Sequence, residues 1–400
     1  MQLVKRILLQ MSNLSKPQFK FLLTLFSTTL MLRGRMNFRN LARYSQLSEM
    51  TYLRNFRKPF DFNELNRQLI EETVPAKHVK IAALDCSYIP KSGKQSYGID
   101  RFWSGQANQA KLGQEISLLS VIDLSYGTAY SLSVEQTPES VEIGKTEENR
   151  IDCYLKQVAE NEKALKRLDI NYLAVDGFYT KTRFIQGVLA AGLQLIGKLR
   201  ADANLRYLYQ GSQRTGRGAP KRYDGKVDFN DLSRWELVTK LPDNLELYTA
   251  VLNSPRFKMN LRVVYLRDLN KPAKRVLFFS TDTEASALDI FRFYKARYQI
   301  EFIFRDAKQH TGLTDCQARN KEALNFHFNT ALTTLNILKN LDRKAKTTQA
   351  KKACSIASWK ARLFNEHLLE RFIQHLELEP ILIKNHPRFE ELRFYGSIAA

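Results

Sequence analysis

The sequence predicts an α/β protein with a helical region at each end and a β-rich segment inside its second half. Two apolar runs, Val79–Asp85 and Tyr172–Gly177, have the β-type composition of buried parallel strands. Helical patterns alternate with these runs and dominate residues 1–75 and 331–400. From about Arg200 helical periodicity disappears, and short β-type runs separated by turns replace it.

The composition favours a polyanionic partner. The chain has 400 residues, and 62 Lys and Arg against 41 Asp and Glu give a net charge of +21. Nucleic acid is the commonest partner of so basic a protein, and an anionic membrane is the alternative. Because the basic residues are spread along the whole chain, a large contact surface on nucleic acid is the better explanation.

Neither the cysteines nor the apolar runs indicate secretion or a membrane anchor. The four cysteines are isolated and show no zinc-binding or disulfide spacing, which favours a reducing cytoplasm. The apolar run Phe21–Leu32 is too short to span a bilayer, and we expect a buried helix there. We therefore expect no membrane partner.

The amino-terminal region contains a candidate helix-turn-helix within Asn37–Lys58. Ser48 is a plausible N-cap of its second helix, and Pro59 ends that helix. The residues expected to face inward there are Met50, Leu53 and Phe56. Arg54 and Arg57 would then lie on the exposed side and contact DNA. The alternative is an ordinary basic helical hairpin.

Asp85 and Asp176 end two similar apolar strands. If the strands are parallel neighbours, their backbones lie about 4.8 Å apart and both carboxylates reach the same edge of the sheet. Adjacent carboxylates repel each other unless a cation holds them. The pair therefore indicates a divalent metal site, although either Asp alone is more often a turn or cap residue. Asp100 and Asp123 follow no clean strand end and are expected to be structural.

The other elements of the core follow in order. We expect strands at Ile116–Asp123, Thr128–Val134 and Gln194–Leu199, and helices at Glu147–Leu168 and Thr180–Ala191. In the β-rich segment we expect strands at Glu236–Lys240, Leu245–Leu252, Leu261–Leu266 and Val276–Ser280. Near the carboxyl end, helices are expected at Lys321–Leu341 and Ser355–Leu378.

The β-rich segment opens with the basic, glycine-rich stretch Arg214–Lys226. It suits a flexible arm that follows a phosphate backbone. The candidate DNA contacts in it are Arg214, Arg217, Lys221 and Arg222. The alternative is a solvated hairpin tip without a ligand.

The stretch Asp289–Gly312 reads as one helix of about six turns, closed by a glycine. At about 100° per residue, four of its polar side chains fall within one narrow arc. They are Tyr294, Arg297, Glu301 and Lys308. A carboxylate flanked by cations and a phenol suits metal-dependent chemistry on phosphates. The alternative is an amphipathic helix with solvated charge pairs.

The spacing Tyr294-x2-Arg297-x3-Glu301-x6-Lys308 resembles the Y-R-E-K signature of the DDE transposases of bacterial insertion sequences. Asp85 and Asp176-Gly177 match the first two acidic motifs of that family in order. A long β insertion before the third acid is a feature of its hairpin-forming, cut-and-paste members. The resemblance implies a ribonuclease H-like catalytic core interrupted by an all-β insertion. Together with the helical patterns at the two ends, this gives a helical DNA-binding region (1–75), the first part of the core (76–200), the insertion (201–284), the second part of the core (285–330) and a helical carboxyl-terminal region (331–400).

The resemblance also implies roles for particular residues. Asp85, Asp176 and Glu301 would hold two Mg²⁺ ions about 3.5–4 Å apart, and Mn²⁺ would also be accepted. Arg297 and Lys308 would grip phosphates near the scissile bond. Tyr294 would bond to the backbone around a flipped base. Trp235 and Trp103 are candidates for stacking on that base.

The implied partners are double-stranded DNA, both the terminal inverted repeats and the target, and a second copy of the chain in a synaptic homodimer. The implied location is the bacterial cytoplasm. Two other functions remain open: a ribonuclease H-like nuclease without strand transfer, and a non-catalytic helix-turn-helix DNA-binding protein. The nuclease needs no insertion, and the DNA-binding protein leaves three well-placed acids unexplained.

Overall fold

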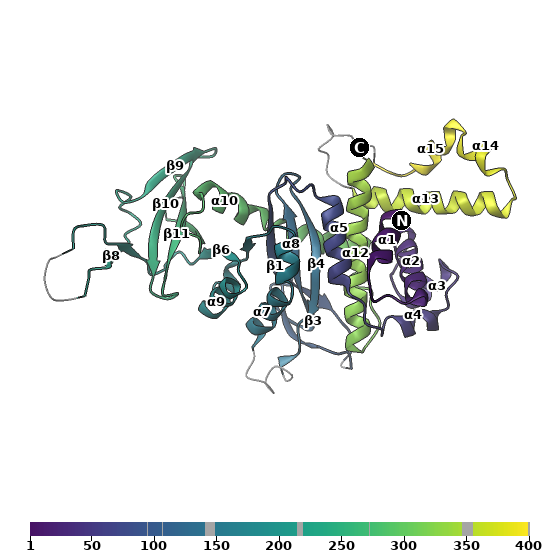
Figure 1. Cartoon of the computed structure of the whole chain (residues 1–400), viewed down its shortest axis with the longest axis horizontal. Helices are drawn as coiled ribbons and strands as arrows, with labels where there is room; N and C mark the ends of the chain where they lie inside the picture. Colours follow the sequence, from purple (N-terminus) through teal and green to yellow (C-terminus); the bar gives the residue numbers. More distant parts are fainter. Residues whose placement is uncertain are drawn as a thin grey trace.

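The computed structural model describes residues 1–93, 95–105, 107–140, 149–213, 219–271, 273–345 and 355–398. The molecule is elongated (Figure 1). A β-rich part lies at one end, a mixed α/β part in the middle, and two groups of helices at the other end, beyond the long helix α12 (Lys321–Ala345).

One mixed sheet of 12 strands runs through the β-rich and α/β parts. Its main path has the order β2-β3-β1-β5-β6-β12-β11-β10-β7-β8, with β4 paired to β3 and β9 paired to β10. The strands of the α/β part are β1 (Lys80–Pro90), β2 (Asp100–Ser104), β3 (Gln109–Asp123), β4 (Thr128–Gln136), β5 (Tyr172–Ala174) and β6 (Gln194–Leu199). The predicted strands of this part are all present.

β1 and β5 are parallel neighbours, which confirms the predicted pairing. Ala82 faces Leu173 and Ala83 faces Ala174. The same register carried two residues further brings Asp85 opposite Asp176. The expectation that Asp85 ends its strand is wrong. β1 continues to Pro90 because the antiparallel partner β3 goes on hydrogen-bonding to it after β5 has ended.

The β-rich segment extends the same sheet. Its strands are β7 (Arg206–Leu208), β8 (Tyr223–Lys226), β9 (Glu236–Leu241), β10 (Leu245–Ser254), β11 (Met259–Asp268) and β12 (Arg275–Ser280). The four predicted runs correspond to β9 to β12, and β7 and β8 are additional. β12 pairs antiparallel with β6, so the segment is joined to the α/β part by backbone hydrogen bonds.

The five amino-terminal helices are α1 (Gln2–Gln10), α2 (Lys16–Met31), α3 (Phe38–Arg43), α4 (Glu49–Asn55) and α5 (Phe62–Thr73). Of these, α2 and α5 pack on α12. Asn336 of α12 bonds to Asn66 of α5 and to both backbone groups of Ser131 in β4. Because these polar groups are buried and paired, they fix α12 and α5 against the sheet.

α3 and α4 form the predicted pair of short helices. Ser48 caps α4 by accepting a hydrogen bond from the Thr51 backbone N–H, as expected. The prediction that Met50 faces inward is wrong, because Met50 is half-exposed. Tyr52 is the fully buried side chain of α4. Phe56 is buried as predicted, and its ring lies 4.6 Å from that of Phe326 in α12.

Two predicted helices are divided in the structure. Within Glu147–Leu168 the described residues form α7 (Arg150–Glu160) and α8 (Glu162–Arg167), which meet at Asn161. The helix expected over Asp289–Gly312 consists of α10 (Ala287–Ala296) and α11 (Gln299–His310). In the turn between α10 and α11, the N–H groups of Tyr298, Ile300 and Glu301 bond three residues back instead of four.

The remaining helices complete the fold. α9 (Thr182–Ala190) lies between β5 and β6 in the chain. Ser355 caps α13 (Ile356–His375), which is followed by α14 (Pro380–Lys384) and α15 (Pro387–Arg393). α2 contains the buried apolar run that the sequence predicts, with Leu22, Leu25 and Phe26 fully enclosed. Among the described residues, no helix has the length and apolarity needed to cross a bilayer.

Candidate active site

Asp85 and Asp176 lie side by side where β1 and β5 stop pairing. The Oδ1 of Asp85 accepts a hydrogen bond of 2.8 Å from the Cys86 backbone N–H. Asp176 caps the single 3-10 turn Gly177–Tyr179, where its Oδ1 accepts a bond of 2.9 Å from the Phe178 N–H. Each carboxylate is therefore oriented by the backbone that follows it.

Arg297 connects Asp85 to the third acid. Its Nη1 lies 3.3 Å from Oδ2 of Asp85, and its Nη2 lies 3.6 Å from Oε1 of Glu301. The Arg297 side chain is only 13% exposed, whereas that of Glu301 is 42% exposed. The Nε of Arg297 is buried and has no hydrogen-bond partner among the described residues, so the guanidinium can still donate to an added anion.

Asp85 is an unusually weak acid. Burial raises its pKa from 3.8 to about 6, and the nearby carboxylates of Asp176 and Glu301 raise it further. Arg297 and the Cys86 N–H oppose these effects without cancelling them. Burial of the carboxyl group therefore outweighs the contact with Arg297 in setting its pKa.

Lys308 and Tyr294 lie on either side of this centre. Lys308 donates hydrogen bonds from Nζ to Ser87 Oγ at 2.8 Å and to the Tyr88 carbonyl at 3.1 Å, so α11 is fastened to β1. Burial lowers the pKa of Lys308. The Tyr294 ring packs on Phe278 of β12 at 4.6 Å between centroids, and the Arg297 guanidinium lies 5.7 Å above it. Burial raises the pKa of Tyr294.

The predicted stripe is therefore built from two helices. Tyr294 belongs to α10, Glu301 and Lys308 belong to α11, and Arg297 lies in the turn between them. The prediction of one straight helix is wrong because the backbone tightens between Lys295 and Glu301. All four side chains still lie on the side of α10 and α11 that packs on the sheet.

A cleft of about 1000 Å³ opens beside the acids. Asp85, Glu301, Lys308 and Trp103 line it, together with Lys111 and Arg305. Trp103 of β2 is 61% exposed, so its ring is accessible from the cleft. Lys111 and Arg305 were missed by the sequence analysis. The i,i+4 spacing of Arg305 from Glu301 could have found it, but nothing in the sequence singles out Lys111.

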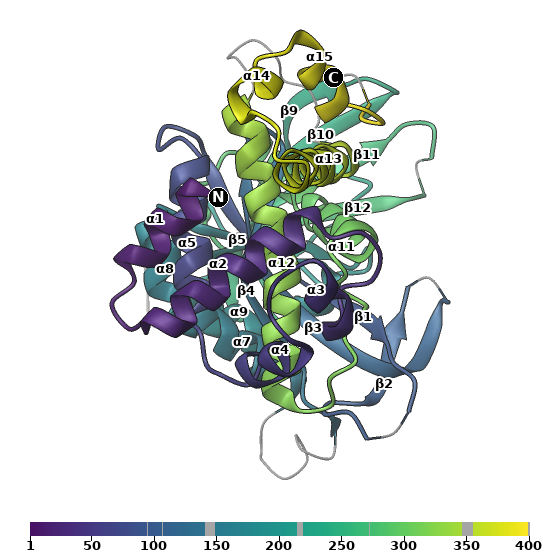
Figure 2. The ribbon, with the colours of Figure 1, turned by 90° about the vertical axis from the view of Figure 1, so that its right-hand side faces the viewer.

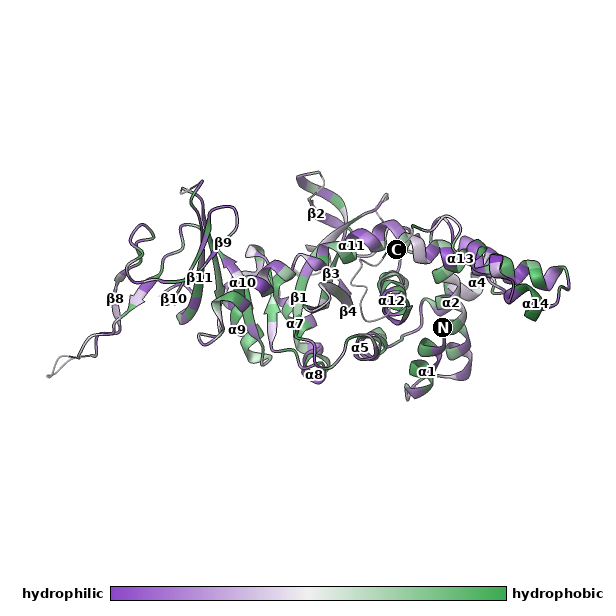
Figure 3. Cartoon of the chain, turned by 90° about the horizontal axis from the view of Figure 1, so that it is seen from above, coloured by the Kyte–Doolittle hydropathy of each residue, from purple (hydrophilic) through white to green (hydrophobic). Residues whose placement is uncertain are grey.

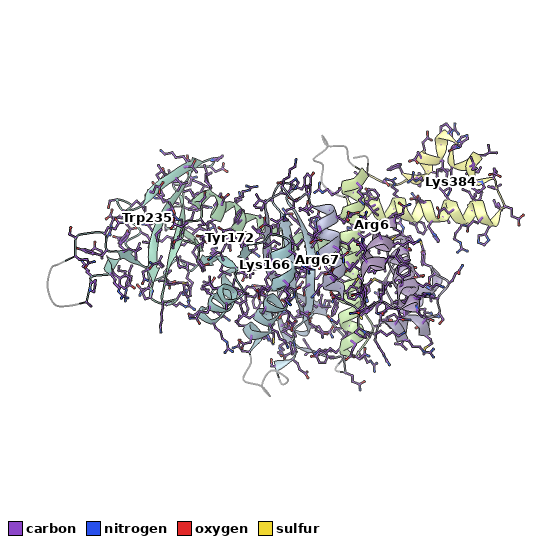
Figure 4. The ribbon with its side chains drawn as sticks, in the orientation of Figure 1. Arg6, Arg67, Lys166, Tyr172, Trp235 and Lys384 are labelled. Atoms are coloured by element: carbon purple, nitrogen blue, oxygen red, sulfur yellow. The ribbon has the colours of Figure 1, made fainter. Side chains whose placement is uncertain are left out.

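Trp235 does not share this cleft. It lies in the β-rich part of the molecule (Figure 4), where it is only 7% exposed. Its ring packs between those of Phe229 and Tyr265, each at 6.0 Å. The expectation that Trp235 could stack on a base is not supported, because both faces of its ring are covered by the core.

Four of the remaining candidate residues, Arg54, Arg57, Lys221 and Arg222, do not line the cleft that contains Asp85 and Glu301. Arg54 and Arg57 are exposed on and just after α4. Lys221 and Arg222 are exposed at the start of the β8 hairpin, and Lys221 forms an ion pair of 2.8 Å with Asp224. Arg214 and Arg217 lie outside the described residues.

Asp100 and Asp123 have structural partners, as predicted. Asp100 forms an ion pair with Arg150 at 3.0 Å. Asp123 is fully buried and accepts a hydrogen bond from the Ser125 N–H, and its other oxygen lies 2.9 Å from Nδ1 of His78.

The three acids suit a hard divalent cation by their chemistry. Carboxylate oxygens are the ligands that Mg²⁺ prefers, and Asp85 has both Asp176 and Glu301 near enough to raise its pKa. In the described part of the chain, no three acidic, His or Cys side chains lie close enough together to enclose a metal ion. The Arg297 guanidinium contacts both Asp85, at 3.3 Å, and Glu301, at 3.6 Å. The exposed Glu301 side chain has the freedom to turn toward the two aspartates.

A carboxylate pair at the edge of a mixed sheet, with a third acid supplied by a helix, defines a class of metal-dependent enzymes that act on phosphodiesters. A family model described as DDE superfamily endonuclease matches residues 30–250, and the chain belongs to this family. The matched segment contains Asp85 and Asp176 and ends before Glu301. No curated protein matches the chain.

Membership in this family bears on the reaction, the metal and the fold of the α/β part. It supports a nuclease or transposase-type activity on DNA, and enzymes of this family generally use divalent metals such as Mg²⁺. It also suggests a ribonuclease H-like arrangement for the α/β part of the molecule.

Proposed function

We propose that this protein is a DNA transposase of the cut-and-paste class, which cleaves insertion-sequence ends and transfers them to target DNA through a hairpin intermediate. The observation that carries the proposal is the convergence of Asp85, Asp176, Arg297 and Glu301 at one edge of the sheet. They come from three separate segments of the chain, and the spacing of the third segment resembles the Y-R-E-K signature.

The proposed core is ribonuclease H-like and comprises residues 76–200 and 285–330. The order β4-β3-β1-β5-β6 supports it, since β3 is antiparallel to β1 while β5 and β6 run parallel to β1 and to each other. Residues 201–284 are the insertion, residues 1–75 the DNA-binding region and residues 331–400 the carboxyl-terminal region. The pairing of β12 with β6 supports an insertion that is rigidly joined to the core.

Asp85, Asp176 and Glu301 would hold the divalent metal, two Mg²⁺ ions in the proposed reaction. When bound, the metal supplies an activated nucleophilic oxygen and stabilises the leaving oxygen. Oδ1 of Asp85 and Oδ1 of Asp176 each accept a backbone N–H, which orients both carboxylates. Arg297, which contacts Asp85 and Glu301 in this structure, would bind a phosphate beside the metal through its guanidinium.

The residues around the acids fit the hairpin step. A hairpin joins two strands across a tight turn and favours extrusion of a base, which costs a few kcal/mol of lost stacking. Trp103 is the aromatic side chain proposed to support that base, because it is exposed and lines the cleft that contains Asp85 and Glu301. Tyr294 and Arg297 would hold the distorted backbone, and Lys308 would contact a phosphate from the cleft wall.

The amino-terminal region and the start of the insertion would provide the other contacts with DNA. Arg54 and Arg57 are exposed on one side of the helical pair α3–α4, which supports recognition of the transposon end. Arg222 and Lys221, with Arg214 and Arg217 of the same stretch, would follow the backbone of the DNA. Neutralising Arg54 and Arg57 together should weaken binding to the end sequence more than it weakens cleavage of a pre-nicked end. Unchanged end binding would contradict this role.

We also propose that the active assembly is a homodimer, since joining two DNA ends requires two sets of acids. The apolar surface of the carboxyl-terminal helices supports it. Leu368, Phe372 and Leu376 are each more than half exposed and lie four residues apart, along one side of α13 and its cap. Ile381 and Leu382 of α14 are exposed too, on the arm that projects from the body (Figure 3). Sedimentation of Phe372→Glu with end DNA should show a monomeric complex if this surface joins two copies.

The decisive experiment is cleavage of an end-labelled duplex that carries the DNA flanking the coding region. Asp85→Ala, Asp176→Ala and Glu301→Ala should each abolish cleavage in Mg²⁺ or Mn²⁺ while DNA binding persists. Asp306→Ala is the matched control, because Asp306 lies on α11 but bonds to Arg305 rather than to β1. Hydrolysis without joining to a target plasmid would identify a nuclease. Binding without cleavage by the unaltered protein would identify a non-catalytic DNA-binding protein.

A further inference from the structure

The cleft that contains Asp85 and Glu301 is continuous with two further clefts. It shares Pro90 and Thr314 with a second cleft of about 850 Å³. The second cleft shares Cys316, Gln317, Ala318 and Arg319 with a third one of about 400 Å³, which reaches α4 at Leu53 and Arg57. We call this series, from Pro90 to Arg57, the connecting groove.

Three segments from distant parts of the chain build the connecting groove. The loop between α11 and α12 forms its floor, and the loops after α2 and after β1 form its walls. The Met36 N–H donates to Oδ2 of Asp315 at 2.8 Å, and the Tyr97 N–H donates to the Arg319 carbonyl at 2.8 Å. Lys91 donates from Nζ to the Cys316 carbonyl. Because both walls are hydrogen-bonded to the floor, the groove is a fixed feature of the fold.

The floor is also fixed to the helix that bears Glu301. Gly312 follows α11 with a φ of +75°, a conformation that favours glycine, and a Cβ there would lie 2.4 Å from that of Met36. His327 of α12 lies with its Nε2 2.8 Å from the Gly312 carbonyl. The helix that bears Glu301, the groove floor and the loop before α3 are therefore in direct contact. Figure 2 shows α3, α11 and β1 on the same side of the molecule.

The connecting groove is positively charged. Arg35, Lys91 and Arg319 line its second cleft, where Asp315 is the acid. Arg35 and Arg319 are exposed, and within the described ranges neither forms an ion pair with a carboxylate. The recorded partner of the Arg319 guanidinium is the neutral amide oxygen of Gln95, at 3.0 Å. Arg35 and Arg319 therefore offer positive charge to an anionic ligand. Because the clefts are joined end to end, a long anion fits them better than a compact one.

We propose that the connecting groove binds the sugar-phosphate backbone of the DNA that lies between the recognition helices and the cleavage point, with Arg35 and Arg319 contacting phosphates. This rests on the proposed function, which puts end recognition near Arg57 and chemistry at Asp85 and Glu301. The groove joins these two places within one chain. A linear polyanion is the ligand class that would fill a charged channel open at both ends.

The test is the salt dependence of DNA binding. Arg35→Ala/Arg319→Ala removes two exposed cations from the groove. Lys163→Ala/Lys166→Ala is the matched control, because it removes two exposed cations from α8, on the core (Lys166 in Figure 4). Both are compared with the unaltered protein on a fluorescent duplex of about 40 base pairs, in EDTA, over a range of salt concentrations. Melting temperatures confirm that both variants are folded.

If each arginine neutralises one phosphate, the slope of log K against log salt should become shallower by about 1.8 in the groove variant. The control should keep the original slope. An unchanged slope in the groove variant, or an equal change in the control, would overturn the proposal. The result is independent of catalysis, since EDTA prevents cleavage. If the unaltered protein fails to cleave any end in Mg²⁺ while the groove variant shows the shallower slope, the groove proposal stands and the transposase proposal fails.

Discussion

In the metal-free protein, ionisation of Asp85 should lower the free energy of unfolding at neutral pH. Its pKa is raised from 3.8 to about 6, so the folded state holds the proton more tightly than the unfolded state does. Stability from this group is therefore fully present below about pH 3.8 and is lost as the pH rises through 6. At about 1.4 kcal/mol for each tenfold change in the dissociation constant, the loss at neutral pH is about 3 kcal/mol.

Asp85→Asn removes this ionisation while keeping an oxygen that can accept the Cys86 N–H. We expect the variant to be more stable than the unaltered protein by up to about 3 kcal/mol near pH 7.5, and by about 1 kcal/mol near pH 4.5. Urea unfolding in EDTA at both pH values measures the difference. Added Mg²⁺ should stabilise the unaltered protein near pH 7.5 and leave Asp85→Asn unchanged.

Asp202→Asn is the control, since Asp202 is exposed and paired with Arg200, and no stabilisation is expected from it. A stability difference for Asp85→Asn that is zero or negative near pH 7.5 would refute the reasoning. It would mean that Arg297 already neutralises the carboxylate and that no uncompensated negative charge awaits a cation.

Further predictions concern the cleft and the core. Tyr294→Ala and Arg297→Ala should still nick a transposon end but accumulate nicked product and form little hairpin on denaturing gels; equal loss of both steps would assign these residues to general binding. An abasic site at the flipped position should partly rescue Tyr294→Ala. Trp103→Ala should keep its stability within about 0.5 kcal/mol, because the ring is exposed, yet lose hairpin yield through about 1–3 kcal/mol of stacking. Lys308→Met should lower the free energy of unfolding by about 1–3 kcal/mol, because Ser87 and Tyr88 lose their shared donor; denaturant melts of Lys308→Arg serve as the comparison. Phe56→Ala should cost about 3–5 kcal/mol in the same assay, since Phe56 is fully buried between α2, α4 and α12.

Several features follow from local sequence. The β-type runs around Asp85 and Asp176 are strands because their apolar side chains leave no solvated face, and the structure pairs them as predicted. The four predicted runs between Glu236 and Ser280 are strands too, and their β-type composition is a property of neighbouring residues. Ser48 caps α4 through its own side chain. Each of these depends on residues within a few positions of one another.

Other features depended on contacts that no local pattern records. β1 extends past Asp85 because β3, joined to it through a long connection, continues to pair with it. The helix expected over Asp289–Gly312 is divided at Arg297, whose side chain reaches across to β1. Tyr52 is buried in α4 and Met50 is half-exposed because the Tyr52 ring packs on Phe21 of α2, at 5.7 Å between centroids.

The sequence by itself determined which residues could do chemistry on phosphates: three acids, two cations and a tyrosine at recognisable spacings. Only the tertiary structure decided how they are arranged. It brings Arg297 between Asp85 and Glu301, makes Trp103 accessible while burying Trp235, and joins Arg35 to Arg319 in one groove. The physical reason is that side-chain type and local propensity are carried by neighbouring residues, whereas burial and charge environment come from packing between segments that the chain keeps far apart.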